Sequence, residues 1–302
     1  MRNIKDELNL NKKKVLLRLD LNVPLINGKI TDTTRIDKII PTIKFLLNND
    51  VKIIILSHVG RPKGKFINEL SLKPICEDLK KKLSENIKLI TKNLKEIDSG
   101  DLFNNQNEKI VMLENLRFYV EEEKNNNEFA KHLASLADIY VNEAFSCSHR
   151  AHASIFEITK FLPSYAGLQL NLEIDALSKI TSEIEKPISC IIGGSKISSK
   201  IGLIENLLRK FKKLLIGGAM ANTFLHAKGL NIGKSFCEPK MTASAKEIIR
   251  KYNDRILLPK DVIVVDCEDS EENFSIDVNN VKNNQIIYDI GPKTRKDFYN
   301  EI

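Results

Sequence analysis

Tryptophan is absent from the sequence, and aromatic residues make up only 6% of its 302 residues. Basic residues are not interleaved with aromatic ones, as they are in proteins that bind single-stranded nucleic acid by base stacking. The formal net charge of +7 nevertheless keeps a nucleic-acid binder open as an alternative. No apolar run approaches the length of a membrane span, and the charged N-terminus lacks the apolar centre of a signal peptide.

Cysteine is scarce as well. The five cysteines lie far apart, are odd in number and show no CxxC spacing; they are Cys76, Cys147, Cys190, Cys237 and Cys267. This pattern predicts buried or idle thiols in a reducing environment, and therefore a cytoplasmic protein.

Short apolar runs recur along the chain, and most are near-continuous, as expected for strands buried on both faces. They lie at 14–21, 51–58, 109–115, 138–145, 187–194, 212–218, 262–268 and 285–291. Segments with helical periodicity lie between them, at 33–49, 72–86, 127–137, 200–211 and 242–252. The alternation predicts an α/β fold with parallel sheets covered by helices.

The chain length allows one large or two ordinary domains. A stretch without strand signals, 158–180, joins two halves and is predicted to be largely helical after Pro163. We therefore expect two domains, 1–170 and 171–302, connected by this helix.

Parallel sheets bind ligands beyond the carboxyl ends of their strands, so the residues that follow each run are candidates for a site. In the first half these residues are largely basic, and Arg35 opens the first helix; the candidates are Asp20, Asn22, His58, Arg61, Arg117 and Arg150. A convergent basic cluster indicates a site for a small acid with several negative charges. The neighbouring His149 and His152 are predicted to orient Arg150.

The second half has glycines and lysines at its strand ends. In "CIIGGSKISSKIGLIENLL", Lys196 and Lys200 stand before a helix, whose free N–H groups and dipole favour an anion. The spacing matches neither the Walker pattern nor the dinucleotide fingerprint, and an ordinary solvated helix start stays open. Gly217 and Gly218 allow a ligand to approach the backbone closely, which favours a nucleotide half. An oxidoreductase is a further alternative, but "DLNVPLING" lacks the G-x-G-x-x-G that it requires.

Nine segments, in family order, resemble the phosphoglycerate kinases: "VLLRLDLNVPL", "ITDTTRI", "LSHVGRPKG", "VMLENLRFY", "SHRAHAS", "GGSKISSKIGLIENLL", "KLLIGGAMANTFL", "LPKDV" and "YDIGPKT". The resemblance implies two Rossmann-like parallel-sheet lobes joined by a hinge helix. It also implies reversible phosphoryl transfer between 1,3-bisphosphoglycerate and ADP, giving 3-phosphoglycerate and ATP in glycolysis. Mg²⁺ would enter as MgATP or MgADP, and the protein would be a monomer.

The resemblance also implies residue roles in the first lobe. Asp20 and Asn22 would contact the hydroxyl and carboxyl end of the glycerate, and Arg35 would lie against the transferring phosphoryl group. The phosphate that is not transferred would be held by His58, Arg61, Arg117 and Arg150. In the second lobe, Lys196 and Lys200 would meet the nucleotide phosphates, and Gly217 and Gly218 would lie along the nucleotide. Arg35 and Lys200 would act catalytically.

The sequence departs from the family pattern in three respects. After "DIGPKT" it lacks the family's Asn-Gly-Pro segment and its Gly-Gly-Asp-Ser/Thr loop, including the aspartate that contacts the metal, so an incomplete second lobe is expected. Ser199 stands where aspartate is usual, while Glu143 and Ser146 replace aspartate and glycine. These departures keep one alternative open: an inactive relative that binds phosphorylated acids only.

Overall fold

The computed structural model describes residues 2–26, 28–103, 107–181, 186–266 and 272–302. The chain divides into two compact units, 1–178 and 179–302. The boundary expected near residue 170 falls close to the start of α6 (Leu168–Thr181), and the structural division falls within that helix.

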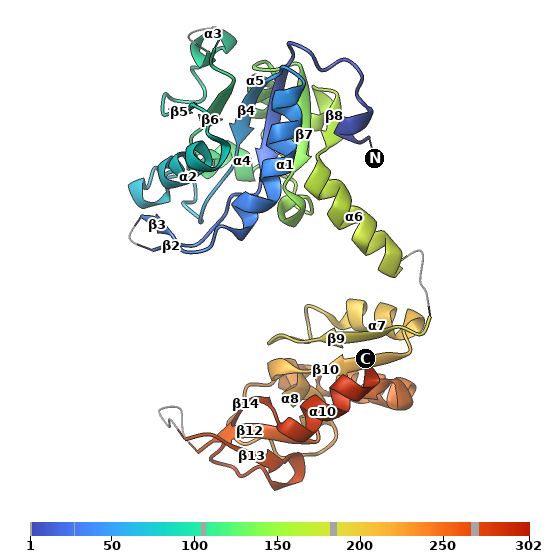
Figure 1. Ribbon diagram of the computed structural model, residues 1–302. Helices are drawn as coiled ribbons and strands as arrows, with labels where there is room; N and C mark the ends of the chain where they lie inside the picture. Colours follow the sequence, from blue (N-terminus) through green and yellow to red (C-terminus); the bar gives the residue numbers. More distant parts are fainter. Residues whose placement is uncertain (1, 27, 104–106, 182–185, 267–271) are drawn as a thin grey trace. The chain divides into compact units, whose positions relative to one another are not determined.

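In the first unit, the described residues form a six-stranded sheet in which every neighbouring pair is parallel. The strands, in spatial order, are β5 (Ile87–Ile90), β6 (Ile110–Leu113), β4 (Lys52–Leu56), β1 (Lys14–Leu19), β7 (Ile139–Glu143) and β8 (Ser164–Ala166). The predicted α/β class with a parallel sheet is confirmed, as Figure 1 shows. A small hairpin, β2 (Leu25–Ile26) and β3 (Lys29–Ile30), lies outside this sheet.

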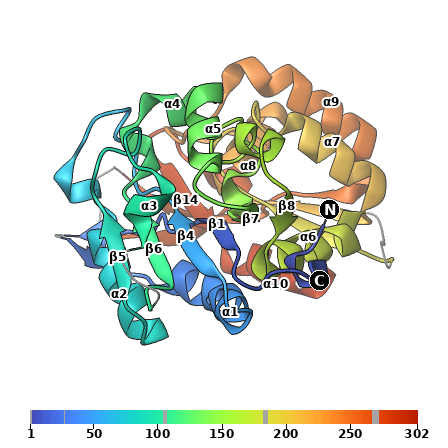
Figure 2. The same ribbon diagram turned by 90° about the horizontal axis from the view of Figure 1, so that it is seen from above.

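Helices cover both faces of the first sheet (Figure 2). One face carries α1 (Thr34–Asn48) and α2 (Lys73–Leu83), and the other carries α3 (Ser99–Leu102), α4 (Val120–Glu123) and α5 (Asn127–Ala134). Successive residues of a strand point to opposite faces, so Leu17 joins the core beneath α1 while Leu16 joins the core beneath α5. The two cores explain why the strand runs are continuously apolar.

Two strands of the six-stranded sheet, β5 and β8, lie outside the predicted runs, as do the hairpin strands β2 and β3. The stretch 158–180 contains β8, so the expectation of a strand-free connector is wrong. The physical reason is that β8 has only three residues, Ser-Tyr-Ala, at the edge of the sheet. Its composition is not typical of a strand, and it is a strand because it pairs with β7. The helix expected after Pro163 is α6.

The second unit contains a parallel three-stranded sheet in the order β11 (Ile256–Leu257), β10 (Lys213–Ile216) and β9 (Ser189–Ile192). Helices α7 (Ile201–Lys210), α8 (Gly218–Ala227) and α9 (Thr242–Tyr252) accompany it, and α10 (Pro292–Glu301) ends the chain. Short 3₁₀ helices occur in both units at Ile4–Asp6, Asn68–Leu70, Leu116–Phe118, Phe145–Cys147, Glu157–Lys160, Pro239–Met241, Asn253–Arg255 and Val278–Asn280.

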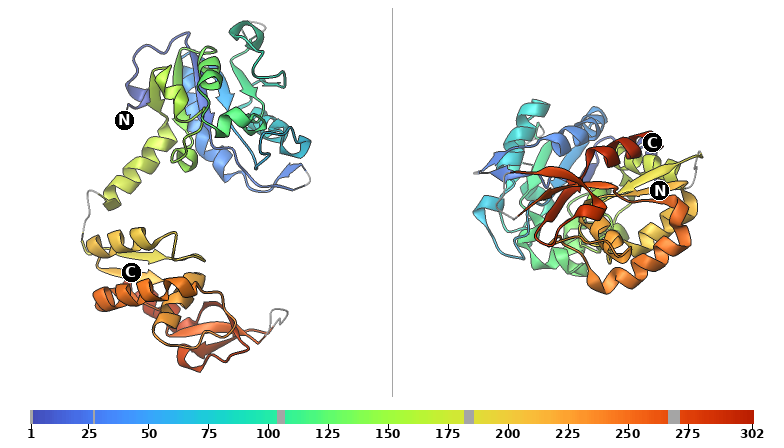
Figure 3. Two further views of the ribbon diagram at one scale, coloured as in Figure 1. Left: turned by 180° about the vertical axis from the view of Figure 1, so that it is seen from behind. Right: turned by 90° about the horizontal axis from the view of Figure 1, so that it is seen from below.

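A separate antiparallel sheet corrects one expectation. The runs at 262–268 and 285–291 were expected to be parallel strands, but β12 (Asp261–Val265) pairs antiparallel with both β13 (Phe274–Asp277) and β14 (Ile286–Ile290). Figure 3 shows these orange and red strands as a sheet of their own. An apolar run does not reveal strand direction. A parallel pair needs a crossover of about a dozen residues or more, and the eight residues 266–273 between β12 and β13 are too few.

The described cysteines are free thiols: Cys76 and Cys147 are buried, and Cys190 and Cys237 are partly buried. The prediction of buried or idle thiols agrees with these four, while Cys267 lies outside the described residues.

Glu143, at the end of β7, joins the first sheet to α6. Its carboxylate accepts hydrogen bonds from the backbone N–H of Gln169 (3.1 Å) and of Leu170 (2.7 Å), and also from the hydroxyl of Thr42. It thereby satisfies free N–H groups in the first turn of the helix. Burial raises the pKa of Glu143. A Cβ atom at Gly167 would overlap the Glu143 carboxyl group, so the chain approaches this side chain with bare backbone.

We expect Leu17→Ala to destabilise the first unit by about 2–5 kcal/mol, because it opens a cavity in a packed core. Leu17 is 0% exposed, and Leu8, which is 98% exposed, provides the matched control. Urea unfolding followed by far-UV circular dichroism measures both variants. Equal unfolding midpoints for Leu17→Ala and Leu8→Ala would contradict the packing described here.

Candidate functional site

The residues that follow four neighbouring strands, β6, β4, β1 and β7, gather at one edge of the first sheet. All seven acid-binding residues predicted from the sequence line one cavity of about 290 Å³. The remaining lining residues are Gly60, Ser146 and Cys147. The parallel pairing of the strands explains this convergence, because parallel strands end at the same edge.

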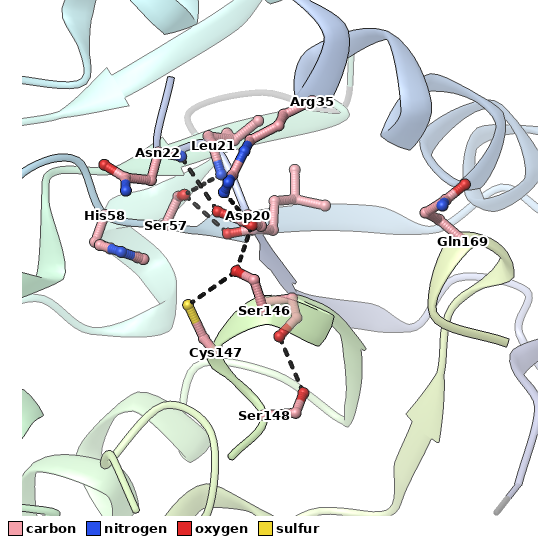
Figure 4. A network of polar contacts seen from close by, with 12 residues as sticks. Asp20, Leu21, Asn22, Arg35, Ser57, His58, Ser146, Cys147, Ser148 and Gln169 are labelled. Atoms are coloured by element: carbon pink, nitrogen blue, oxygen red, sulfur yellow. Dashed lines mark hydrogen bonds and ion pairs between the residues drawn. The ribbon is translucent and has the colours of Figure 1, made fainter. Parts of the chain in front are cut away.

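Asp20 is the centre of a polar network shown in Figure 4. Its Oδ2 accepts hydrogen bonds from Arg35 Nη1 and from Ser146 Oγ, both at 2.5 Å. Its Oδ1 receives only a long contact, 3.4 Å, from the backbone N–H of Asn22. The contact of Asp20 with Arg35 is therefore much shorter than the contact with its own backbone that a turn residue would make.

Ser146 is absent from the residues that the sequence predicts for the site. In the sequence it stands out only as a departure from the family's glycine. The structure shows its hydroxyl on Asp20, and Cys147 Sγ lies 3.7 Å from Ser146 Oγ. A hydroxyl residue in the loop directly after a buried strand is the signal that could have identified Ser146 as a site residue.

Side-chain hydrogen bonds join the ends of β1 and β4. Asn22 Oδ1 accepts a hydrogen bond from the backbone N–H of Gly60 (2.9 Å). Ser57 Oγ donates to the carbonyl of Leu19 (2.9 Å) and accepts from the N–H of Leu21 (3.2 Å). With its oxygen used in this way, the side chain of Asn22 has only its amide N–H donors left to offer.

Arg117 is the most deeply placed arginine of the cavity, with a side chain only 4% exposed. Its Nη1 donates to the carbonyl of Gly60 (2.8 Å), and its Nε lies 3.4 Å from Glu123 Oε1. Burial lowers the pKa of Arg117 below the usual arginine value, although arginine stays charged in proteins. Its position is thus fixed before any ligand arrives.

The two histidines next to Arg150 differ in their contacts. Arg150 Nε lies 3.4 Å from His149 Nε2, a long contact that is compatible with the predicted orienting role. His152 is buried, and its Nδ1 lies 3.8 Å from Glu122 Oε1, so it packs towards this acid.

His58 is 2% exposed and contacts a fully buried charge, Arg18, whose Nη2 lies 2.9 Å from His58 Nδ1. Burial lowers the pKa of His58, and the positive charges of Arg18 and Arg117 lower it further. The imidazole is therefore neutral at ordinary pH. Arg18 is also missing from the residues that the sequence predicts, although a charge inside the apolar run "VLLRLDL" is a signal for it.

In the second unit, two glycine loops lie against each other: Gly193 and Gly194 follow β9, and Gly217 and Gly218 follow β10. Met220 N donates to the carbonyl of Gly194 (2.8 Å). Gly218 has φ = +64°, and a Cβ there would lie 3.0 Å from Gly194 N. Lys200 Nζ would lie 3.0 Å from a Cβ at Gly194, so this ammonium group reaches the same loops. The glycines therefore serve the approach of backbone to backbone.

Lys196 is exposed in the loop before α7, and Lys200 stands directly before the first residue of that helix. Glu238 anchors this loop: it accepts hydrogen bonds from the N–H (3.0 Å) and the hydroxyl (2.6 Å) of Ser198. These two hydrogen bonds, with a smaller contribution from the charge of Lys196, lower the pKa of Glu238. Gly217 precedes α8, and its N–H donates to the carbonyl of Ile192 (2.9 Å), while no side-chain hydrogen bond caps the start of that helix.

Two negative findings apply to the described parts of the chain. None of their helices is both long and apolar enough to cross a bilayer. Within the same ranges, no three His, Cys, Asp or Glu side chains gather in a way that suits a metal ion.

Comparison with known proteins gives a consistent match. The family model described as "Phosphoglycerate kinase" matches residues 5–302. A phosphoglycerate kinase of Wolbachia pipientis from Culex pipiens is 46% identical over 295 residues, which cover 94% of this chain and 72% of that protein. One of Dictyoglomus turgidum is 44% identical over 303 residues, covering 99% of this chain and 76% of the relative.

Solved structures agree. The phosphoglycerate kinase of Coxiella burnetii matches with a TM-score of 0.83 at 39% identity, over 99% of this chain and 76% of that one. The enzyme of Pyrococcus horikoshii matches with a TM-score of 0.86 at 26% identity, over 100% of this chain and 78% of that one. The chain therefore spans about three quarters of the length of these relatives.

We expect Gly218→Ala to destabilise the second unit by about 1–3 kcal/mol, because an alanine is strained at this positive φ and meets the Gly194 backbone. The matched control is Gly202→Ala in α7, where a Cβ meets nothing within 4 Å. The control should be stabilising by about 0.5–1 kcal/mol. Thermal unfolding of the two variants should therefore shift in opposite directions, and shifts of the same sign would be inconsistent with this loop geometry.

We also expect His58 to make stability depend on pH. The folded-state pKa of His58 is lowered, so below its ordinary value of 6.5 only the unfolded chain takes up this proton. Stability is therefore lost as the pH falls below that value. When the pH is lowered from about 7.5 to about 5.5, the free energy of unfolding should fall in both proteins. The fall should be about 1.4 kcal/mol smaller in His58→Gln than in the parent chain.

Urea unfolding at the two pH values measures this difference. His226→Gln is the control, because His226 is exposed and lies in the second unit, far from this network in the sequence. It should keep the parent's pH dependence. An identical pH dependence in His58→Gln and the parent would refute the neutral, buried imidazole.

Proposed function

The chain belongs to the phosphoglycerate kinase family, and we propose how its own residues share out the reaction of that family. The family transfers a phosphoryl group reversibly between 1,3-bisphosphoglycerate and ADP, a step of glycolysis. In this proposal the first unit binds the phosphorylated acid, and the second unit binds the nucleotide.

One observation carries the proposal: the cavity of the first unit is lined by four guanidinium groups and one neutral histidine, with a single carboxylate, Asp20. Guanidinium groups offer paired donors that match phosphate and carboxylate oxygens. A small acid with several negative charges satisfies such a set of donors, whereas a neutral ligand leaves them unpaired. The donors for the phosphate that stays on the acid are His58, Arg61, Arg117 and Arg150.

Asp20 and Asn22 orient the other end of the acid. The carboxylate of Asp20 is the acceptor for a glycerate hydroxyl, and the amide N–H groups of Asn22 face the carboxyl end. Arg35 holds Asp20 in the free protein. Because Arg35 is also 47% exposed at its side chain, it is free to turn towards the transferring phosphoryl group.

The nucleotide phosphates lie, in this proposal, at the glycine loops of the second unit. Lys196 and Lys200 supply positive charge there, and Gly218 at the start of α8 supplies a backbone N–H group. Gly217, whose own N–H donates to the carbonyl of Ile192 (2.9 Å), lies along the nucleotide. Magnesium arrives as MgATP or MgADP, because this ion is held chiefly by nucleotide phosphates and keeps several of its waters.

Phosphoryl transfer asks little covalent chemistry of the protein. It requires in-line positioning and neutralisation of the charge on the transferring group. Arg35 and Lys200 are the catalytic groups under this proposal, because each stands where one substrate's phosphoryl oxygens are expected. The proposal needs no nucleophilic serine or cysteine, in agreement with the hydrogen bond that already occupies the Ser146 hydroxyl.

The relatives named above are kinases, and none of the findings favours an inactive relative that binds only phosphorylated acids. Two binding measurements on the full chain separate these possibilities. Titration calorimetry with 3-phosphoglycerate and, separately, with MgATP should detect both ligands, whereas binding of the acid alone would support the inactive alternative. We place the protein in the cytoplasm. We also propose that it is a monomer, and analytical ultracentrifugation would check this oligomeric state.

We expect Arg35→Ala to lower turnover by about 10²–10³-fold, because it removes a charged donor from the transition state. A coupled assay of ADP-dependent phosphoryl transfer measures this effect. Lys44→Ala, at an exposed position of the same helix, is the matched control and should keep the parent's turnover. Equal turnover in Arg35→Ala and the parent would refute the role of Arg35.

A further inference from the structure

Arg18 is a charged residue in the middle of the first sheet. It lies in β1, between β4 and β7, and is 1% exposed. Burying a guanidinium group is costly unless its donors are paired. Its position in an otherwise apolar strand therefore calls for an explanation beyond packing.

Each part of the Arg18 guanidinium group has a partner. Nη1 donates to the carbonyl of Leu19 (2.5 Å), Nε donates to Ser154 Oγ (3.0 Å), and Nη2 lies 2.9 Å from His58 Nδ1. The contacts continue to a second buried charge, because Ser154 Oγ donates to Glu122 Oε1 (2.6 Å) and Ser154 N to Oε2 (2.9 Å). Glu122 thus balances Arg18 through one hydroxyl.

The contact between Arg18 and His58 determines where the imidazole proton lies. A guanidinium group has donors and no acceptor, so Nδ1 of His58 must present its lone pair. In the neutral ring the proton is then on Nε2. Since His58 lines the acid-binding cavity, the ring is left with one N–H donor for a ligand.

We infer that Arg18 is a positioning residue of the acid-binding site: it fixes His58 as the Nε2–H tautomer, so that a buried neutral ring donates a hydrogen bond to an oxygen of the phosphorylated acid. This inference rests on the proposed function. Arg18 acts through His58 and does not touch the substrate.

The choice of tautomer matters because the wrong one reverses the role of the ring. With the proton on Nδ1, Nε2 would present a lone pair to an anion and repel it. The guanidinium group prevents this arrangement, since two donors would then face each other. Arg18 thereby converts a residue that can accept or donate into one that only donates.

The tautomer can be read directly by nitrogen–carbon correlation NMR of the imidazole rings in the full parent chain. Five histidines are present, and the His58→Phe variant assigns the signal of His58. We expect an unprotonated Nδ1 and a protonated Nε2. A protonated Nδ1 in the parent overturns the inference, and this measurement needs no variant of Arg18.

The Arg18→Met variant keeps much of the side-chain volume and removes every donor. We expect His58 to show a mixture of tautomers in this variant, and its affinity for 3-phosphoglycerate to fall about tenfold. In the His58→Phe background, Arg18→Met should have no further effect on affinity, because its route through the ring is already absent. Unchanged tautomer and affinity in Arg18→Met, or an undiminished loss in the double variant, overturns the inference.

Ser154→Ala is the matched control. It removes a neighbouring hydrogen bond of Arg18 and leaves the contact with His58 in place. It should keep the parent's tautomer, which separates the specific contact from general disturbance of the buried network. If the parent chain fails to bind 3-phosphoglycerate at all, the proposed function fails, while the tautomer of His58 is still measurable.

Discussion

Parallel pairing of β6, β4, β1 and β7 is the constraint on which the proposed acid-binding site depends. The pairing sets the ends of four strands side by side, so that loops distant in sequence deliver their charged groups to one cavity. Hydrogen bonds between the loops, such as Asn22 to Gly60, then fix their spacing. The site is therefore a property of the sheet, and the loops only supply its chemistry.

Charge is distributed unevenly around this cavity. Arg35 and Arg61 of the cavity are exposed, whereas Arg18 is 1% exposed and is balanced by Glu122 through Ser154. Burial of the ring, together with the charge of Arg18, keeps His58 neutral, while the proposed function assigns the exposed arginines to the anion. Burial alone does not separate the arginines by role, because Arg117 is buried and also lines the cavity.

Much of the first unit followed from the sequence because the physical signals were local. Continuous apolar runs predicted the buried strands β1, β4, β6 and β7, and the residues after them predicted the cavity. The structure also contains features that no local pattern carries. The edge strand β8 is defined by its partner, and the antiparallel direction of β12 depends on its connections. Arg18 and Ser146 belong to the site through contacts with residues far away in the sequence.

The contact between Glu143 and Gly167 restricts how this sequence can change. The carboxyl group fills the space where a side chain at residue 167 would stand, and it holds the first turn of α6. Substitutions at the two positions are therefore coupled. A residue with a Cβ atom fits at position 167 only if a shorter side chain replaces Glu143. Because the two side chains compete for the same space, residues 143 and 167 should covary across related sequences.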